Sequence, residues 1–383
     1  MSIKPEISVV VPCLNEEEAI LLCLNEIEET IKKYNLNTEI IVVDNGSSDG
    51  SLAILQKKSS EIPYLRILVE LERGYGAAYL KGLSGAQGVY IFMADADFSY
   101  EFSDIPRFID KLKEGNDLVV GNRFMGKIGK NSMPWHHKYI GNPLLSHIFK
   151  LLFKVKINDI HCGARAINRN FLNKIKLHTK GMEFASEMII AASQKKLRLA
   201  EIPVRYRERK GESKLQSTRD GWRHLRLMLL YSPFYLFLIP GVIMFLTGFV
   251  TLFILYFSSP RLFDIQFFVH PMFFSSLLVI TGYQMIFFLG FSRVYAINHL
   301  GEENAQWERL FKSITIEKVG FAGIFISLIG ISIYIYIFYT WIRTGFGSLN
   351  EIKNSIVALT FLVLGMQTFF SSFMLSILSI RDK

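Results

Sequence analysis

The sequence predicts two domains of different kinds, an α/β domain with a mainly parallel sheet and then an α-helical membrane domain of four helices. In the first 226 residues, short apolar runs alternate with helical patterns, which is typical of a parallel sheet. From residue 227 the chain is rich in Phe, Ile, Leu and Tyr, and charges fall in short islands. Four of the apolar stretches reach the ~20 residues needed to cross a bilayer. We therefore expect a soluble domain at 1–217, a juxtamembrane interfacial helix at 218–231 and a transmembrane domain at 232–383.

The elements of the first domain are expected in regular order. Short runs rich in Val, Ile and Leu predict strands at 7–11, 39–43, 65–69, 89–94 and 117–121. Helices are predicted from Asn15 to about Tyr34, after the turn residues 44–50, and near 75–86 and 103–114. Asn15 precedes three glutamates, which is the pattern of a helix N-cap. Ligands of such sheets bind beyond the carboxyl ends of the strands, so the residues just after each strand are the candidates for a site.

The four spans are expected at 233–257, 268–291, 319–342 and 355–379. Pro233 and Pro240 lie early in the first span, so a kink or a helix restart is expected there. Basic residues gather in the loop between the second and third spans and after the fourth: Arg293, Arg309, Lys312, Lys318, Arg381 and Lys383. By the positive-inside rule, the first domain, this loop and the C-terminus are cytoplasmic. The spans hold almost no ionisable residues, which counts against a channel or a pump.

The formal net charge is +9, and much of the basic excess lies between Arg205 and Arg226, just before the first span. This cluster either attracts anionic lipid, at ~1 kcal/mol per residue, or serves only as the orientation signal. No pattern of a nucleic-acid-binding module accompanies the charge, so nucleic acid is not expected. The segment 136–156 places apolar residues among His and Lys, and both an interfacial helix and an ordinary core helix fit it.

The three cysteines lie in the first domain without metal-ligand spacing, which indicates reduced thiols. The N-terminal residues lack the apolar core of a signal peptide. Both features favour a cytoplasmic first domain.

Acidic residues follow two of the expected strands. Asp44 ends the second strand, and Asp95 and Asp97 follow the fourth. Two carboxylates one residue apart at a turn can converge on one divalent ion. Oxygen ligands with room for phosphates suit Mg²⁺ or Mn²⁺. Such an ion would act as a Lewis acid on a departing diphosphate.

Nine motifs follow one another along about 1–230: VVVPCLNEE, VVDNGSSDGS, ERGYGAAYLKGL, MADADFS, VGNRF, DIHCGARAINR, EFASEMI, EIPVRY and RERKGESKL. In these motifs and their order, the chain resembles the inverting GT-A glycosyltransferases of family 2 that include dolichol-phosphate-mannose synthase and the bactoprenol glucosyltransferases. Some members also carry C-terminal transmembrane helices. The resemblance implies a GT-A, Rossmann-like nucleotide-sugar-binding domain. The chain departs from the family at 99–102, where Ser-Tyr-Glu-Phe replaces the frequent Gln followed by His-Pro-Pro, and at Cys13, where an aromatic residue is usual.

The resemblance implies a role for each matching residue. The residues expected to line the base and ribose pocket are Pro12, Cys13, Asn15, Glu16 and Asp44. Asp95 and Asp97 are expected to meet the metal and the diphosphate. The residues expected to hold phosphates of donor or acceptor are Arg123, Lys138, Arg207, Arg209, Ser213 and Lys214. The residues expected to be catalytic are Asp97, Asp159, Arg123 and Arg209.

Three acidic residues keep two interpretations each. Asp159 either orients the acceptor and stabilises positive charge on the sugar, or forms a structural cap or salt bridge. Glu183 and Glu187 are expected near the same cleft, in functional or structural roles.

The implied reaction is inverting transfer of a hexose from a nucleotide-diphosphate sugar, UDP-glucose or GDP-mannose, to a polyprenyl or dolichyl phosphate at the cytoplasmic membrane face. A lipid phosphate is already anionic, so it needs positioning more than a general base, and the metal with Arg and Lys would stabilise the departing diphosphate. Membrane lipid is an expected partner, and a homo-oligomer stays open. The alternatives are a polysaccharide synthase, although residues 216–220 lack the Trp of the Gln-x-x-Arg-Trp motif, and a non-catalytic translocator or scaffold for lipid-linked sugar.

Overall fold

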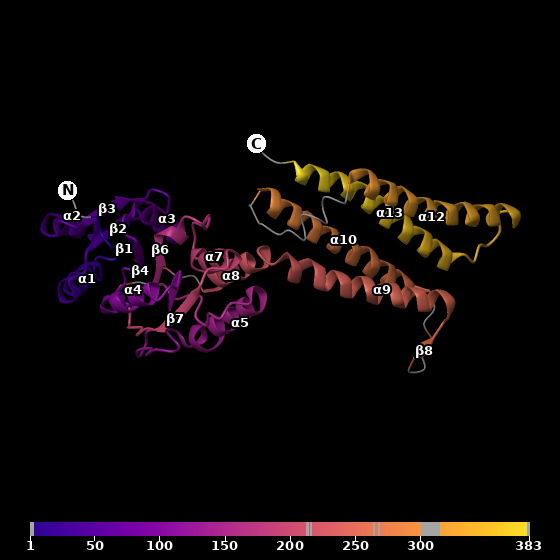
Figure 1. Ribbon diagram of the computed structural model, residues 1–383. Coiled ribbons are helices and arrows are strands. Elements are labelled where there is room, and N and C mark those ends of the chain that lie inside the picture. Colours follow the sequence, from indigo (N-terminus) through magenta and orange to yellow (C-terminus); the bar gives the residue numbers. More distant parts are fainter. Residues whose placement is uncertain are drawn as a thin grey trace. The chain divides into compact units, whose positions relative to one another are not determined.

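The structure is a computed structural model that describes residues 4–211, 214, 217–262, 265–266, 269–299 and 315–380. The chain divides into two compact units, Met1–Tyr231 and Ser232–Lys383 (Figure 1). Each unit is described by itself. Ser213 and the basic residues Arg309, Lys312, Arg381 and Lys383 lie outside the described residues.

The first unit is built on a seven-stranded sheet of order β3-β2-β1-β4-β6-β5-β7. Its strands are β1 Ile7–Cys13, β2 Thr38–Asp44, β3 Leu65–Val69, β4 Tyr90–Met93, β5 Leu118–Asn122, β6 Arg165–Asn168 and β7 Leu199–Pro203. β6 runs antiparallel to β4 and β5, whereas the other neighbouring pairs are parallel. The five predicted strands and the mainly parallel sheet are confirmed.

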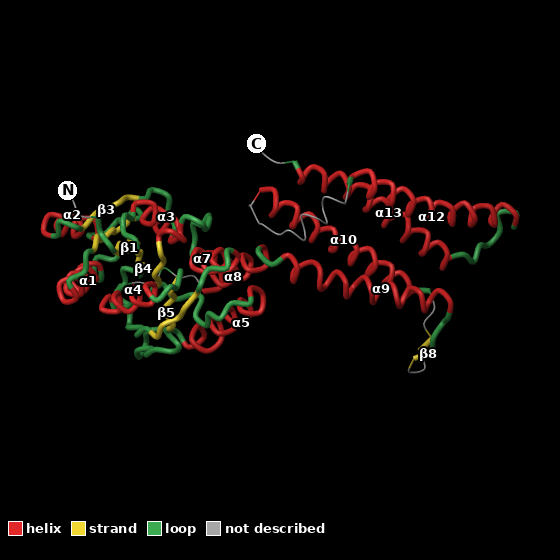
Figure 2. Tube along the Cα trace, viewed as in Figure 1, coloured by secondary structure: helices red, strands yellow, loops and turns green. Residues whose placement is uncertain are grey.

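The helices of this unit are α1 Ile20–Tyr34, α2 Ser51–Glu61, α3 Tyr75–Gly85, α4 Ile105–Lys113, α5 Asn142–Phe153, α6 Arg169–Leu172, α7 Phe184–Gln194 and α8 Ser217–Leu230 (Figure 2). A short 3₁₀ turn, Phe102–Asp104, precedes α4, and a short π-helix, His137–Gly141, precedes α5. The predicted N-cap at Asn15 is wrong: α1 begins at Ile20, and its N-cap position is Ala19. Asn15 has a positive φ of 52° and bonds to a different loop.

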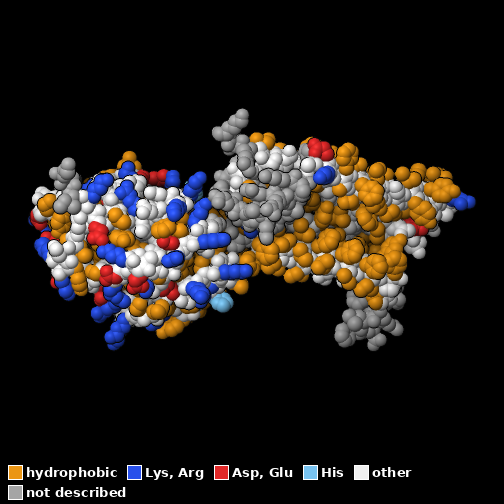
Figure 3. Space-filling view, in the orientation of Figure 1, with side chains coloured by type: hydrophobic (Ala, Val, Ile, Leu, Met, Phe, Trp, Pro, Cys, Tyr) orange, Lys and Arg blue, Asp and Glu red, His pale blue; other side chains and the backbone are white. Residues whose placement is uncertain are grey.

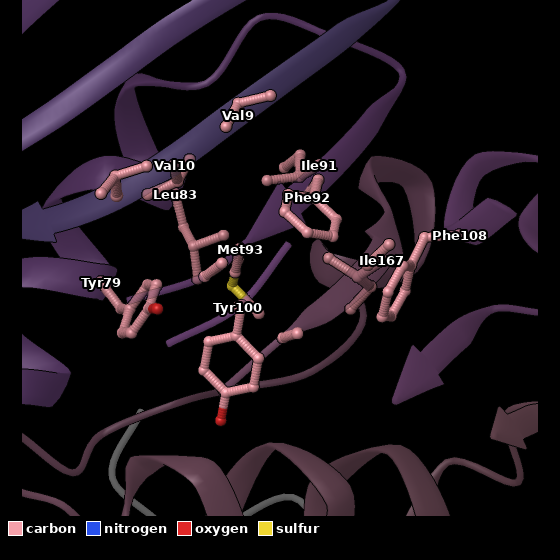
Figure 4. Close-up of a cluster of buried hydrophobic side chains, with 14 of the residues drawn as sticks. Val9, Val10, Tyr79, Leu83, Ile91, Phe92, Met93, Tyr100, Phe108 and Ile167 are labelled. Carbon is pink, nitrogen blue, oxygen red and sulfur yellow. The ribbon is translucent and has the colours of Figure 1, made fainter. Parts of the chain in front are cut away.

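The core lies on both faces of the sheet, and each face is covered by a different helix. Adjacent strand residues point to opposite faces, so Val9 and Val10 of β1 enter different halves of the core (Figure 4). Gly82 lets α3 approach the Val10 face, because a Cβ there would lie 2.4 Å from Val10 Cγ1. On the Phe92 face, the ring of Phe108 from α4 packs edge-on at 5.1 Å.

The second unit contains four long apolar helices, α9 Ile239–Phe257, α10 His270–His299, α12 Ile316–Arg343 and α13 Ile352–Ser379, and a small hairpin, β8 Arg261–Leu262 with β9 Ile265–Gln266. Each of the four helices is long and apolar enough to span a membrane, and apolar side chains dominate their surface in Figure 3. A kink or a helix restart was predicted near Pro233 and Pro240. The helix begins at Pro233 after a break at Tyr231 and Ser232, and a short π-helix, Phe234–Leu238, passes directly into α9, which has Pro240 in its first turn.

Glycines let these helices pair closely. A Cβ at Gly282 of α10 would lie 2.6 Å from the Gly241 carbonyl oxygen of α9, and a Cβ at Gly365 of α13 would lie 2.6 Å from that of Gly323 in α12. Small residues at these crossings allow the backbone contact that stabilises helices in lipid.

Candidate active site

Three parallel strands bring the predicted acidic residues to one edge of the sheet. β1 lies between β2 and β4, so Cys13, Asp44 and the segment after Met93 share the carboxyl edge. Asp95 and Asp97 follow β4 there, in the position where open α/β sheets bind ligands.

Asp95 is held by two tyrosines of α3. The hydroxyls of Tyr75 and Tyr79 donate to Asp95 Oδ1 at 3.0 and 3.2 Å. The other oxygen lies against the backbone at Gly163, where a Cβ would be 2.5 Å from Asp95 Oδ2. Burial, and then the negative charge of Asp97, raise the pKa of Asp95 above its usual value. Burial and the neighbouring carboxylate therefore both disfavour the charged form of Asp95.

Asp97 faces Arg209, which the backbone places there. Lys210 N donates to Asp97 O at 2.9 Å, and Arg207 N donates to Ser99 O at 2.8 Å, so the segment 207–210 runs beside 97–99. Arg209 Nη2 then lies 3.0 Å from Asp97 Oδ2. Ser99 N donates to the other oxygen, Oδ1, at 3.0 Å.

Glu16 forms the second acidic position facing these cations. Lys214 Nζ forms an ion pair with Glu16 Oε1 and donates to Asn15 O at 2.8 Å, and Arg209 Nη2 lies 4.0 Å from the same Glu16 oxygen. Burial raises the pKa of Glu16 to about 6 although Lys214 opposes this shift. Within the described part of the chain, Glu16 Oε2 is buried without a hydrogen-bond partner. Two carboxylates and two cations thus meet at the strand ends.

The chemistry of Asp95 and Asp97 fits a divalent cation whose other ligands come from outside the protein. Both residues offer hard oxygen ligands, and the raised pKa of Asp95 reflects its burial and then the negative charge of Asp97. Among the described residues, no group of three or more His, Cys, Asp or Glu side chains is arranged to hold a metal. Phosphate and water oxygens would have to complete the coordination, as is usual for Mg²⁺.

Arg123 and Asp159, for which separate roles were predicted, bind one another. Arg123 Nε and Nη2 donate to the two oxygens of Asp159, each at 2.8 Å, and Arg123 N donates at 3.0 Å. Asp159 is fully buried, and the Arg123 guanidinium lies 5.1 Å from the Tyr206 ring centroid. Burial lowers the pKa of Arg123, but its surroundings, the Asp159 carboxylate first among them, together raise it well above its usual value, so the guanidinium stays charged. The pair uses Nε and Nη2, which leaves Nη1 as the nitrogen that can meet a phosphate.

A residue that the sequence analysis missed holds this pair in place. Glu201 of β7 accepts from Asn158 N at 2.7 Å, Asp159 N at 3.0 Å and Asn122 Nδ2 at 3.1 Å. One carboxylate therefore ties the end of β5 to the loop that carries Asp159. In the sequence, Glu201 was visible only as the Glu of the EIPVRY motif, and its hydrogen-bond partners lie more than 40 positions away.

The predicted base pocket is a set of loops joined by side chains. Asn15 Oδ1 accepts from Ser48 N at 2.7 Å, which ties the loop after β1 to the loop after β2. Asp44 accepts weakly from Gly46 N and Ser47 N, each at 3.3 Å. The Cys13 thiol is buried, and this burial raises its pKa to about 12. Pro12 precedes it in β1 and is half-buried.

Asn45 was also missed. Its amide donates to Glu70 O at 2.9 Å and Glu72 O at 2.8 Å, and it accepts from Gly74 N at 2.7 Å. It therefore joins the end of β2 to the segment that leads into α3.

Two predicted phosphate ligands have other contacts. Arg207 pairs with Glu26 at 2.7 Å, and its guanidinium lies 4.0 Å from the Phe98 ring centroid. Lys138 lies in the turns before α5, with Nζ 5.3 Å from the Tyr139 ring centroid. Neither is paired with Asp95 or Asp97 in the contacts described.

Glu187 stabilises a loop that covers the start of α3. Its carboxylate accepts from His178 N at 2.9 Å and from Thr179 N at 2.9 Å. This loop passes so close to α3 that a Cβ on Gly76 would lie 2.2 Å from Thr179 O. These contacts account for Glu187 structurally. Glu183 Oε2 is buried and has no partner among the residues described.

Comparison with known proteins decides the family. The model of glycosyl transferase family 2 matches residues 8–176, and that of the glycosyltransferase family 2 C-terminal transmembrane region matches 290–379. The low-salt glycan biosynthesis hexosyltransferase Agl6 of Haloferax volcanii is 33% identical over 375 residues, covering 97% of this chain and 89% of that protein. The chain belongs to glycosyltransferase family 2. It is a membrane protein with a GT-A domain followed by four apolar helices.

Further relatives match over about three fifths of the chain. The dolichol-phosphate mannosyltransferase of Pyrococcus furiosus is 29% identical over 230 residues, covering 58% of this chain and 64% of that protein. The dolichyl-phosphate beta-glucosyltransferase of Saccharomyces cerevisiae is 29% identical over 253 residues, covering 60% and 75%. Among solved structures, glucosyl-3-phosphoglycerate synthase from Mycobacterium tuberculosis covers 60% of this chain and 80% of its own, with 18% identity and a TM-score of 0.47.

Proposed function

We propose that this family 2 enzyme transfers a hexose from a nucleotide-diphosphate sugar to a polyprenyl phosphate, with inversion, at the cytoplasmic membrane face. The observation that carries the proposal is the Asp95–Asp97 pair at the strand ends, faced by Arg209. The names of the Pyrococcus and Saccharomyces relatives support a polyprenyl phosphate as the acceptor, and those of all three support a hexose. UDP-glucose and GDP-mannose are the donors we put first.

A divalent cation bound at Asp95 and Asp97, Mg²⁺ or Mn²⁺, would neutralise the diphosphate that leaves. Arg209 and Lys214 pair with Asp97 and Glu16, so they are the cationic side chains beside the carboxylates that would hold the metal, and the donor phosphates would bind against them. Both groups are strong phosphate ligands, and arginine binds phosphate with a bidentate fork.

The acceptor side is built around Arg123. Asp159 keeps its guanidinium charged and fixed, and Glu201 fixes Asp159, so the free Nη1 has a defined direction. A phosphate monoester is already ionised near neutral pH, so the site needs to position it rather than deprotonate it. We place Asp159 in this positioning role.

An exposed apolar surface on α5 and on the turns before it supports a lipid acceptor. α5 carries Leu144 and Leu151 exposed, and the preceding turns expose Tyr139 and Ile140, while Phe149 faces the core. The helix therefore has one core face and one exposed apolar face, which fits an interfacial position. The basic residues before the first span support a cytoplasmic position for this unit.

The test is transfer by the purified, detergent-solubilised full chain. Undecaprenyl and dolichyl phosphate are offered with radiolabelled UDP-glucose, GDP-mannose and UDP-N-acetylglucosamine, with Mg²⁺ or Mn²⁺. We expect one donor to label lipid, and label to be lost with EDTA and with Asp97→Asn. Asp110→Asn, an exposed aspartate of α4, is the matched control and keeps full activity. If no donor labels lipid while nucleotide still binds, the acceptor is wrong, and transfer to a growing polysaccharide or a carrier role takes precedence. Transfer that survives Asp97→Asn contradicts the catalytic site.

A further inference from the structure

Two histidines from distant parts of the first unit meet in its interior. His161 follows Asp159 by two residues, and His224 belongs to α8, the helix that leads toward the first span. Their rings meet edge to face, with centroids 4.6 Å apart and an interplanar angle of 90°. His224 Nδ1 shares a buried hydrogen bond of 2.8 Å with Ser186 Oγ of α7. His224 is thereby fixed, and it fixes one side of His161.

His161 itself has unused hydrogen-bonding capacity. Both of its ring nitrogens are buried, and neither has a hydrogen-bond partner in the described part of the chain. A buried polar group without a partner costs roughly 1–3 kcal/mol, so such a group in a folded protein calls for a ligand, a water or a functional role. Burial, then His224 and Arg123, lower the pKa of His161 well below its usual value. The ring is therefore neutral and offers one N–H donor.

The surroundings of this ring favour an anion. Arg123, Arg165 and His137 all act on His161 electrostatically, from three different segments. The Arg165 guanidinium donates its hydrogen bonds to backbone carbonyls, to Cys162 O at 2.8 Å and to Ile160 O at 2.7 Å. Arg123 keeps Nη1 beyond its pair with Asp159. A neutral donor beside a fixed guanidinium is a suitable pair of groups for a phosphate.

Of the two phosphate groups in the reaction, the acceptor's fits this position. The donor diphosphate belongs at Asp95, Asp97 and Arg209, where the charges of the strand ends converge. His161 instead follows Asp159, the partner of Arg123, by two residues, and its ring packs against His224 of α8.

We propose that His161, positioned by His224, donates a hydrogen bond to the phosphate of the lipid acceptor and so distinguishes the acceptor from the donor. This inference rests on the proposed function. It adds a substrate-binding residue, His161, and a positioning residue, His224, that couples acceptor binding to α8.

The test separates acceptor binding from donor binding. His161→Phe keeps an aromatic ring against His224 and removes both nitrogens, whereas His161→Gln keeps an N–H donor. We expect His161→Phe to raise the KM for a short-chain polyprenyl phosphate about tenfold or more, with the KM for the donor changed by less than about twofold. His161→Gln should recover most of the loss. Asp110→Asn, at the exposed aspartate of α4, is the control and should leave both KM values unchanged.

Several results would overturn the inference. An unchanged acceptor KM in His161→Phe, or an equal rise in both KM values, would show that the ring serves only packing. Thermal unfolding of each purified variant shows whether it folds, and if His161→Phe does not fold, His161→Leu, which also lacks a donor, is judged by the same criteria. If the wild-type chain transfers no sugar to any lipid phosphate, the proposed function fails and this inference with it. An active wild type with an unchanged acceptor KM in the variant refutes this inference alone.

Discussion

Replacing Asp159 by Asn should destabilise the first unit strongly, because it breaks a buried ion pair from one side. Asp159 is fully buried and accepts three hydrogen bonds from Arg123, at 2.8, 2.8 and 3.0 Å. Asn keeps one acceptor oxygen and turns an amide N–H toward the guanidinium. Leaving one partner of a buried pair uncompensated costs ~3–5 kcal/mol. For a unit of this size, this corresponds to a fall in Tm of about 6–20 °C.

The assay is thermal unfolding of the purified chain in detergent, followed by circular dichroism. Asp110→Asn is the control, with an expected change within about 2 °C, because surface substitutions have small effects. The double variant Arg123→Met, Asp159→Leu should be more stable than Asp159→Asn, because an apolar pair replaces a buried ion pair at little cost. A fall in Tm below about 2 °C for Asp159→Asn would refute the reasoning, since such a small effect means a solvated carboxylate.

Three further predictions follow from the contacts. Gly76→Ala should lower the free energy of unfolding by ~2 kcal/mol or more, because the Cβ would lie 2.2 Å from Thr179 O. Gly221→Ala of α8 should raise it by up to ~1 kcal/mol, because no described atom lies within 4 Å of its Cβ. Equal Tm values for the two variants would contradict this prediction. Lowering the pH from about 7.5 to about 5.5 should weaken Mn²⁺ binding in calorimetry, because burial and Asp97 raise the pKa of Asp95 and burial raises that of Glu16 to about 6, so protons compete with the ion. The fold should not be lost through these two groups over this range: the folded chain binds their protons more readily than the unfolded chain, so their contribution to stability is full at low pH and lost as the pH rises through about 6. Cys13 and Cys162, whose pKa values burial raises to about 12, should react with maleimide only after denaturation, and fast labelling of the native chain would contradict their burial.

The sequence predicted those parts of the fold that depend on local pattern. The β-branched runs of β1 and β2 and the long apolar spans carry their own signal, because a buried strand or a membrane helix needs apolar residues along its whole length. Asp95 and Asp97 were predictable from the same local pattern, because they follow shortly after the apolar run that forms β4. β6 and β7 were not predicted, because polar residues such as Arg165, Asn168 and Glu201 interrupt their short apolar runs.

Contacts between distant segments could not be predicted from local pattern. Asn15 has the composition of an N-cap, but its side chain bonds Ser48 N, 33 positions away, and its own φ of 52° excludes the cap geometry. The Arg123–Asp159 pair joins residues 36 positions apart. Arg207 was predicted as a phosphate ligand from the family resemblance, and only the structure shows its pair with Glu26, 181 positions away.

Mass spectrometry of the lipid product tests the central claim most directly. The purified chain is incubated with Mn²⁺, a defined polyprenyl phosphate and the active donor. The lipid is then extracted, and its mass is measured. The account predicts a single new species, the polyprenyl phosphate plus one hexose, released by mild acid as free hexose and absent with Asp97→Asn. A lipid that carries the sugar with a diphosphate, a product with several sugars, or an unmodified lipid beside consumed donor would contradict transfer of one hexose to a lipid phosphate.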